Sequence, residues 1–73
     1  QIARRILETR LSTFSTTGID WPAAVKAGEG LSQAELARSA AEAAKRAILE
    51  DRETVTNDDL TGAIAERKAA ALP

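Results

Sequence analysis

Cysteine and histidine are both absent from the 73 residues of this chain. The absence of cysteine excludes disulfide bonds, and the absence of both residues excludes the usual zinc sites. Nucleophilic catalysis by a cysteine, or by a serine that a histidine activates, is excluded as well. We therefore expect no catalytic residue and no metal site within the chain.

An excess of one charge is also lacking, because ten basic residues are balanced by eleven acidic ones, for a formal net charge of -1. A chain with this balance has no overall positive field that would attract nucleic acid or an anionic membrane. Apolar runs are short, and none approaches the roughly 20 residues that span a bilayer. We expect a cytoplasmic protein with neither nucleic acid nor membrane as a partner.

Methionine is missing too, and an amphipathic pattern begins at Gln1 without a leader segment. These features predict that the chain is a fragment of a longer protein. A chain of this length forms one small domain that buries only about 60% of its unfolded surface, so its core must be economical.

Aromatic residues are limited to Phe14 and Trp21, and alanine dominates the apolar set. Small side chains favour helices that approach one another closely. No alternating strand pattern occurs, whereas apolar residues recur at helical spacing. We predict an all-α fold, a single four-helix domain in which short helices surround one long central helix. The predicted helices cover about residues 1–14, 21–27, 33–50 and 57–70.

Three helix starts are marked by capping residues. Asp20 is the expected N-cap of the second helix. Ser32 and Glu35 have the spacing of a capping box at the start of the long helix, and Thr56 and Asp59 repeat it at the start of the last one. These boundaries depend on local chemistry alone.

The faces of the helices follow from the same periodicity. We expect Arg38–Glu42 and Glu42–Arg46 pairs on the outside of the long helix. We expect the aliphatic stem of Arg67 in the buried stripe of the last helix, and fraying over residues 69–73. The expected inner face of the long helix consists of small residues and one isoleucine: Ala37, Ala40, Ala41, Ala44, Ala47 and Ile48.

The stretch "LSQAELA" at residues 31–37 is typical of the helix that opens a helix-turn-helix motif. A glycine and an apolar residue should then follow at positions 41 and 42, where this chain has Ala41 and Glu42. Because the helix continues without a turn, no recognition helix is available for the major groove. DNA binding is therefore the least favoured hypothesis.

Four stretches in combination resemble the C-terminal helical lid of AAA ATPases of bacterial type: "ARRILETRLSTF", "IDWPAAVKAGEGLSQAEL", "AAEAAKRAI" and "VTNDDLTGAIAERK". The resemblance covers roughly residues 2–68. It implies a lid that closes over ATP or ADP with magnesium, held by a P-loop domain of the same chain. It also implies a neighbouring subunit in a homo-oligomeric ring, a hexamer of the parent chain. Residues 1–73 have no phosphate-binding loop, so we expect neither ATP hydrolysis nor a bound nucleotide in the fragment alone.

The resemblance also implies which residues lie near the nucleotide. Ser32, Gln33 and Ala34 correspond to the helix start that lies against the adenine and ribose. Ile6 corresponds to an apolar adenine contact, and Arg10 to a polar neighbour of the ribose. The family usually has glycine where this chain has Gln33.

Simpler roles remain open for these residues. Ser32 caps its helix with or without a nucleotide, Ile6 fits a plain core position, and Arg10 fits a solvated charge. Trp21 fits a core anchor, an edge against a missing domain or a subunit contact. The main alternative for the whole chain is a histone-like helical dimerisation module without nucleotide. Such modules bury large apolar residues on their long helix, where this chain has mostly alanine.

Overall fold

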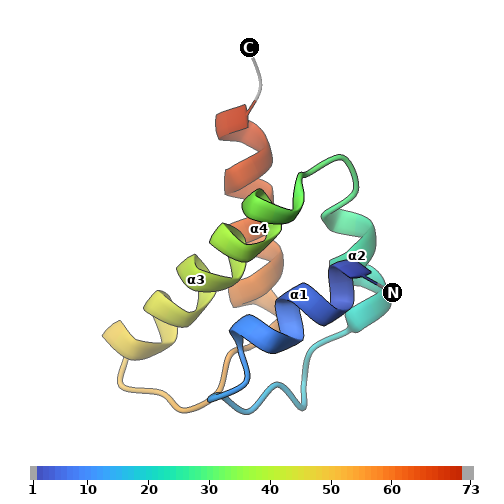
Figure 1. The fold of residues 1–73 in the computed structure, drawn as a ribbon. Helices are drawn as coiled ribbons and strands as arrows, with labels where there is room; N and C mark the ends of the chain where they lie inside the picture. Colours follow the sequence, from blue (N-terminus) through green and yellow to red (C-terminus); the bar gives the residue numbers. More distant parts are fainter. Residues whose placement is uncertain (1, 72–73) are drawn as a thin grey trace.

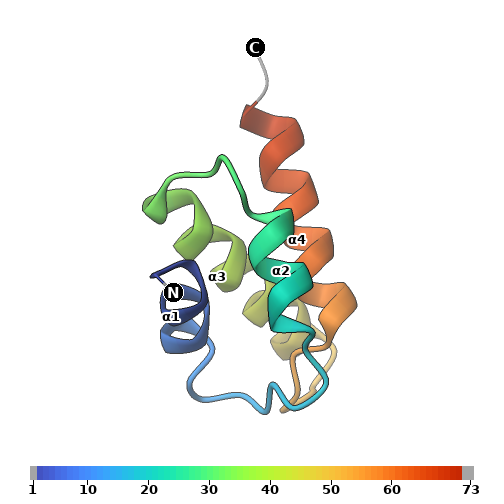
Figure 2. The ribbon, with the colours of Figure 1, turned by 90° about the vertical axis from the view of Figure 1, so that its right-hand side faces the viewer.

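The computed structural model describes residues 2–71, which form four α-helices and no strand (Figure 1). The predicted all-α class is therefore confirmed. The long helix α3 packs against α1 and α4, and α2 packs against α4 and α1 (Figure 2). The bounds of the helices are α1 (Ile2–Arg10), α2 (Trp21–Ala27), α3 (Gln33–Leu49) and α4 (Asn57–Ala71).

The core is built around alanine residues of α3, which let the flanking helices approach closely. Branched side chains from the other helices and from the connections fill the space on either side. The buried apolar residues are Leu7, Leu11, Ile19, Ala24, Leu36, Ala40, Ala43, Ala47, Val55, Leu60, Ala63 and Ile64.

The buried face of α3 differs from the predicted one. Ala41 and Ile48, both expected inside, are exposed, whereas Ser39 and Ala43 are buried. The apolar positions that are buried, at 36, 40, 43 and 47, repeat at spacings of four, three and four, which places them on one seam between α1 and α4. Ser39 tolerates burial because its hydroxyl donates a hydrogen bond to the carbonyl of Glu35 at 3.0 Å.

The first helix ends earlier than predicted, at Arg10 instead of about residue 14. Beyond it, the backbone N–H groups of Ser12 and Phe14 bond three residues back, which tightens the chain into turns. Ser15 then pairs with the α3–α4 connection, donating to the carbonyl of Glu53 at 2.9 Å and accepting from the N–H of Val55 at 3.0 Å. The chain after α1 is therefore held by a distant segment and not by helical hydrogen bonds.

The predicted caps are present. The Asp20 side chain accepts the N–H of Ala23 at the start of α2. The C-cap of α2 is Gly28, where a Cβ would lie 2.7 Å from Leu36 Cδ2, so a larger residue there would force the Leu36 side chain to shift. The left-handed conformation occurs two residues later, at Gly30 with φ of 91°.

The C-terminal end of α3 is a Schellman motif without glycine. The N–H of Asp51 bonds to the carbonyl of Ile48 at 3.0 Å, and the N–H of Arg52 bonds to that of Ala47 at 2.8 Å. Asp51 occupies the left-handed position with φ of 57°, which is costly for a residue with a Cβ.

Helix α4 continues to Ala71, one residue beyond its predicted end and into the segment where fraying is expected. Gln1, Leu72 and Pro73, which the predictions also covered, lie outside the described residues. No helix between residues 2 and 71 combines the length and the apolar composition that crossing a membrane requires.

Candidate functional site

An open depression lies between α1 and the first turn of α3, with a volume of about 640 Å³. Helix α1 contributes two adjacent rows of side chains, because residues four positions apart lie on one face: Arg5 lies in line with Thr9, and Ile6 with Arg10. Helix α3 contributes its first turn and the start of its second. The lining residues are Arg5, Ile6, Thr9, Arg10, Gln33, Ala34 and Ala37.

Four of the five residues that the resemblance placed near the nucleotide line this depression: Ile6, Arg10, Gln33 and Ala34. They come from two segments more than 20 positions apart in the sequence, so their convergence is a property of the fold. Ser32 is the N-cap immediately before this turn and is not among the lining residues.

Three further lining residues had not been identified from the sequence. Arg5 and Thr9 precede Ile6 and Arg10 by one position on α1, and Ala37 lies one turn after Gln33. Helical periodicity around the residues already chosen would have found them. Ile6 has both roles considered for it, since it lines the depression and packs against the core.

The depression has a positive rim. Its lining holds two arginines and no acidic residue, although the whole chain carries a formal charge of -1. Neither Arg5 nor Arg10 forms an ion pair with another of the described residues. The start of the 17-residue helix α3 adds its unpaired N–H groups and the positive end of its dipole. The arrangement suits a ligand that has an apolar part and an anionic part.

The capping box at this helix start is formed as predicted. The Ser32 hydroxyl accepts the N–H of Glu35 at 3.1 Å, and the Glu35 carboxylate accepts the N–H of Ser32 at 3.1 Å. The first turn of α3 is therefore fixed by its own side chains, and Gln33 and Ala34 are held in position beside the depression.

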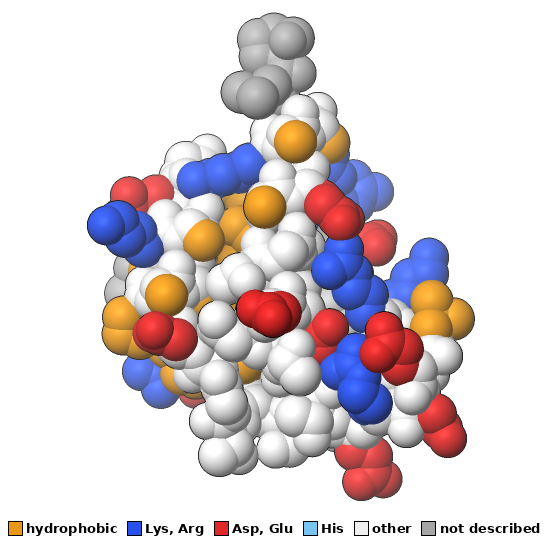
Figure 3. Space-filling view, turned by 180° about the vertical axis from the view of Figure 1, so that it is seen from behind, with side chains coloured by type: hydrophobic (Ala, Val, Ile, Leu, Met, Phe, Trp, Pro, Cys, Tyr) orange, Lys and Arg blue, Asp and Glu red, His pale blue; other side chains and the backbone are white. Residues whose placement is uncertain are grey.

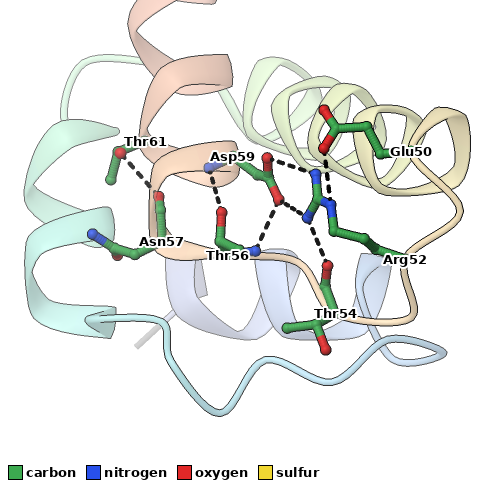
Figure 4. A network of polar contacts seen from close by, with 7 residues as sticks. All are labelled: Glu50, Arg52, Thr54, Thr56, Asn57, Asp59 and Thr61. Carbon is green, nitrogen blue, oxygen red and sulfur yellow. Dashed lines mark hydrogen bonds and ion pairs between the residues drawn. The ribbon is translucent and has the colours of Figure 1, made fainter.

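A second capping box, at the start of α4, belongs to a larger polar network (Figure 4). The Asp59 carboxylate accepts the N–H of Thr56 at 2.9 Å, and the Thr56 hydroxyl accepts the N–H of Asp59 at 3.1 Å. Arg52 donates to both oxygens of Asp59, at 2.6 and 3.2 Å, to Glu50 at 3.1 Å and to the carbonyl of Thr54 at 3.0 Å. The sequence pattern had predicted the cap but not the arginine.

The network shifts the ionisation of its members. The hydrogen bonds from Arg52 lower the pKa of Asp59 from 3.8 to about 2, with a further contribution from Thr56. The bond to Asp59 raises the pKa of Arg52 in turn. Because this network lies beyond the other end of α3, about 25 Å along the helix, it stabilises the fold without lining the depression.

A smaller hollow of about 370 Å³ lies between α3 and α4. Its lining includes Arg67, whose Nε is buried and has no hydrogen-bond partner among residues 2–71, and whose side chain is partly buried as predicted. Arg46 does not pair with Glu42; its guanidinium forms an ion pair with Glu66 of α4 instead.

Seen from behind, the molecule carries acidic and basic side chains next to one another (Figure 3).

Trp21 is half-buried against the core, with the Arg4 guanidinium 5.4 Å from its ring centroid. Arg4 also pairs with Glu8 at 3.2 Å. This stacking joins the start of α2 to α1.

No protein-family model matches the chain, and no curated protein is significantly similar to it.

Proposed function

We propose that this chain is the helical lid subdomain of an AAA ATPase, closing over the adenine and ribose of ATP or ADP bound by a P-loop domain of the same polypeptide. The observation that carries the proposal is the depression between α1 and α3. Four of the five residues that the resemblance placed near the nucleotide line it, although they come from two segments more than 20 positions apart in the sequence. Its volume lies within the range of small-molecule sites.

The residues present fit an adenine nucleoside. Ile6, Ala34 and Ala37 offer an apolar surface for a flat base. Gln33 and Arg10 offer polar groups for the edge of the base and for the ribose. Magnesium and the phosphates would be held by the P-loop domain, and the chemistry of hydrolysis would take place there. The role of this chain is to bind and enclose the nucleoside end.

Coupling to motion requires that ATP and ADP favour different orientations of the lid, because a ligand with equal affinity for both shifts nothing. The four helices would move together as one rigid body, because hydrogen bonds join segments that are distant in the sequence. The backbone of Ser15 is hydrogen-bonded to the α3–α4 connection. The N–H of Asp20, at the start of α2, donates to Asn57 Oδ1 at the start of α4, at 3.0 Å. In a cytoplasmic hexameric ring, such a lid would also contact the next subunit.

The same fold argues against the two alternatives. A histone-like module leaves the face of its long helix for a second copy, whereas α1 and α4 of the same chain cover the alanine face of α3 here. A helix-turn-helix needs a turn after Ala37, and α3 continues without interruption to Leu49. Sedimentation of the chain should therefore show a monomer, and a concentration-dependent dimer would favour the histone-like alternative.

The first test is the coding sequence upstream of Gln1. A phosphate-binding G-x-x-x-x-G-K-[ST] loop after a strand is expected within about 200 residues, the size of one preceding domain. An open reading frame without such a domain would refute the proposed function.

The second test fills the depression in the intact chain, by which we mean the full-length parent protein that contains both the P-loop domain and residues 1–73. Ala34→Trp places a large side chain on its wall, and we expect affinity for ATP to fall by at least about tenfold, as for the loss of a well-packed contact. Ala41→Trp is the matched control, because Ala41 is an exposed alanine of the same helix outside the depression. Equal effects of the two variants on nucleotide affinity would contradict the proposed site.

A further inference from the structure

The side chain of Gln33 is free for a ligand. It is exposed at the first position of α3, between the two residues whose side chains cap the helix. Here the reciprocal bonds between Ser32 and Glu35 already serve that purpose. The Gln33 amide makes no hydrogen bond with any other residue in the described part of the chain, yet it lines the depression.

The amide is also chemically distinct from the other polar groups of the lining. Arg5 and Arg10 are donors only. Thr9 has a hydroxyl, in which one oxygen both donates and accepts. Gln33 alone among the lining residues offers a donor and an acceptor side by side in one plane. That geometry matches an edge of adenine, where the 6-amino donor adjoins a ring-nitrogen acceptor.

Resting on the proposed function, we propose that Gln33 is the residue that determines base specificity in this depression. Its Oε1 accepts a hydrogen bond from the 6-amino group of adenine, and its Nε2 donates one to the adjacent ring nitrogen. Ile6, Ala34 and Ala37 contact the face of the base. A purine without the 6-amino group leaves the Oε1 acceptor without its partner and binds more weakly.

The test compares two ligands and two variants of the intact chain. ATP is measured against purine riboside triphosphate, which has hydrogen in place of the 6-amino group. Gln33→Met keeps the length of the side chain and removes both hydrogen-bonding groups. Lys45→Met is the control, since Lys45 is an exposed residue of α3 outside the depression.

We expect the intact chain without substitutions to bind ATP about tenfold more tightly than purine riboside triphosphate. This ratio is the size of one hydrogen bond, the one between the 6-amino group and Oε1. Gln33→Met should remove this preference, because ATP loses two hydrogen bonds and purine riboside triphosphate loses only the one to its ring nitrogen, whereas Lys45→Met should preserve it. Circular dichroism of each variant checks that the helices are intact.

The outcomes separate this inference from the function on which it rests. If Gln33→Met weakens both nucleotides equally, or neither, the inference is overturned while ATP binding itself stands. If the intact chain binds ATP but Ala34→Trp has no effect, the depression is not the nucleotide site, and both fail. If the intact chain binds no ATP, both fail as well.

Discussion

Replacing Asp59 by asparagine tests how much the polar network at the start of α4 stabilises the fold. The neutral amide oxygen still accepts the N–H of Thr56, but the charged pair with Arg52 is lost. A pKa of about 2 in place of 3.8 corresponds to at most about 2.5 kcal/mol for the ionised carboxylate. The pair still contacts solvent, with side-chain exposures of 28% for Arg52 and 12% for Asp59, and screening reduces this to about 1–1.5 kcal/mol.

The other capping box supplies a matched control. Glu35→Gln makes the same change of carboxylate to amide at the same position of a helix, in a box whose carboxylate has no arginine partner. We expect Glu35→Gln to lower the free energy of unfolding by less than about 0.5 kcal/mol, because a neutral acceptor remains. Urea unfolding followed by far-UV circular dichroism, at about pH 7, gives both values.

The pH dependence has a definite sign. The pKa of Asp59 is lower in the folded state than in the unfolded state, so its stabilisation is present above pH 3.8 and is lost as the pH falls through about 2. The difference between the unmodified chain and Asp59→Asn should therefore shrink across that window. A difference that stays constant from neutral pH to pH 2, or that equals the effect of Glu35→Gln, would refute the reasoning.

Three further substitutions should change the free energy of unfolding in urea titrations. Asp51→Gly should raise it by about 0.5–1 kcal/mol, since glycine occupies the left-handed position without strain; a loss would contradict this. Gly28→Ala should lower it by about 1–3 kcal/mol because the new Cβ meets Leu36, whereas Gly18→Ala, with nothing within 4 Å, should not lower it. Arg67→Met should leave it unchanged or raise it by up to about 1 kcal/mol, because it removes a buried N–H that has no acceptor; a large loss would reveal a missed partner.

The features that the sequence predicted well depend on neighbouring residues. Both capping boxes and the Asp20 cap are local, because donor and acceptor lie three positions apart, and all three were found where the pattern placed them. The existence of four helices follows from periodicity in the same way. Local chemistry therefore determined where helices begin.

The features that the sequence missed depend on distant residues. The segment that follows α1 pairs through Ser15 with residues 53–55, and no local signal announces that pairing. The partner of Arg46 is Glu66 across the helix interface, not Glu42 on the same helix. Gly62 permits this crossing, since a Cβ there would lie 3.0 Å from Arg46 Nη1. The buried face of an alanine-rich helix such as α3 is especially hard to predict, because several of its faces are equally apolar.

The two ends of α3 differ in a way that bears on the proposed function. At its C-terminal end, backbone pairing joins the α3–α4 connection to Ser15, and the Arg52 network joins the same connection to the start of α4. At its N-terminal end, the capping box is closed by Ser32 and Glu35, and the side chains of Gln33, Arg5 and Arg10 make no hydrogen bond or ion pair with another of the described residues. Polar groups that take no part in holding the fold are available for a ligand. Under the proposed function, the fastened end would let the whole unit move with a nucleotide bound at the open end.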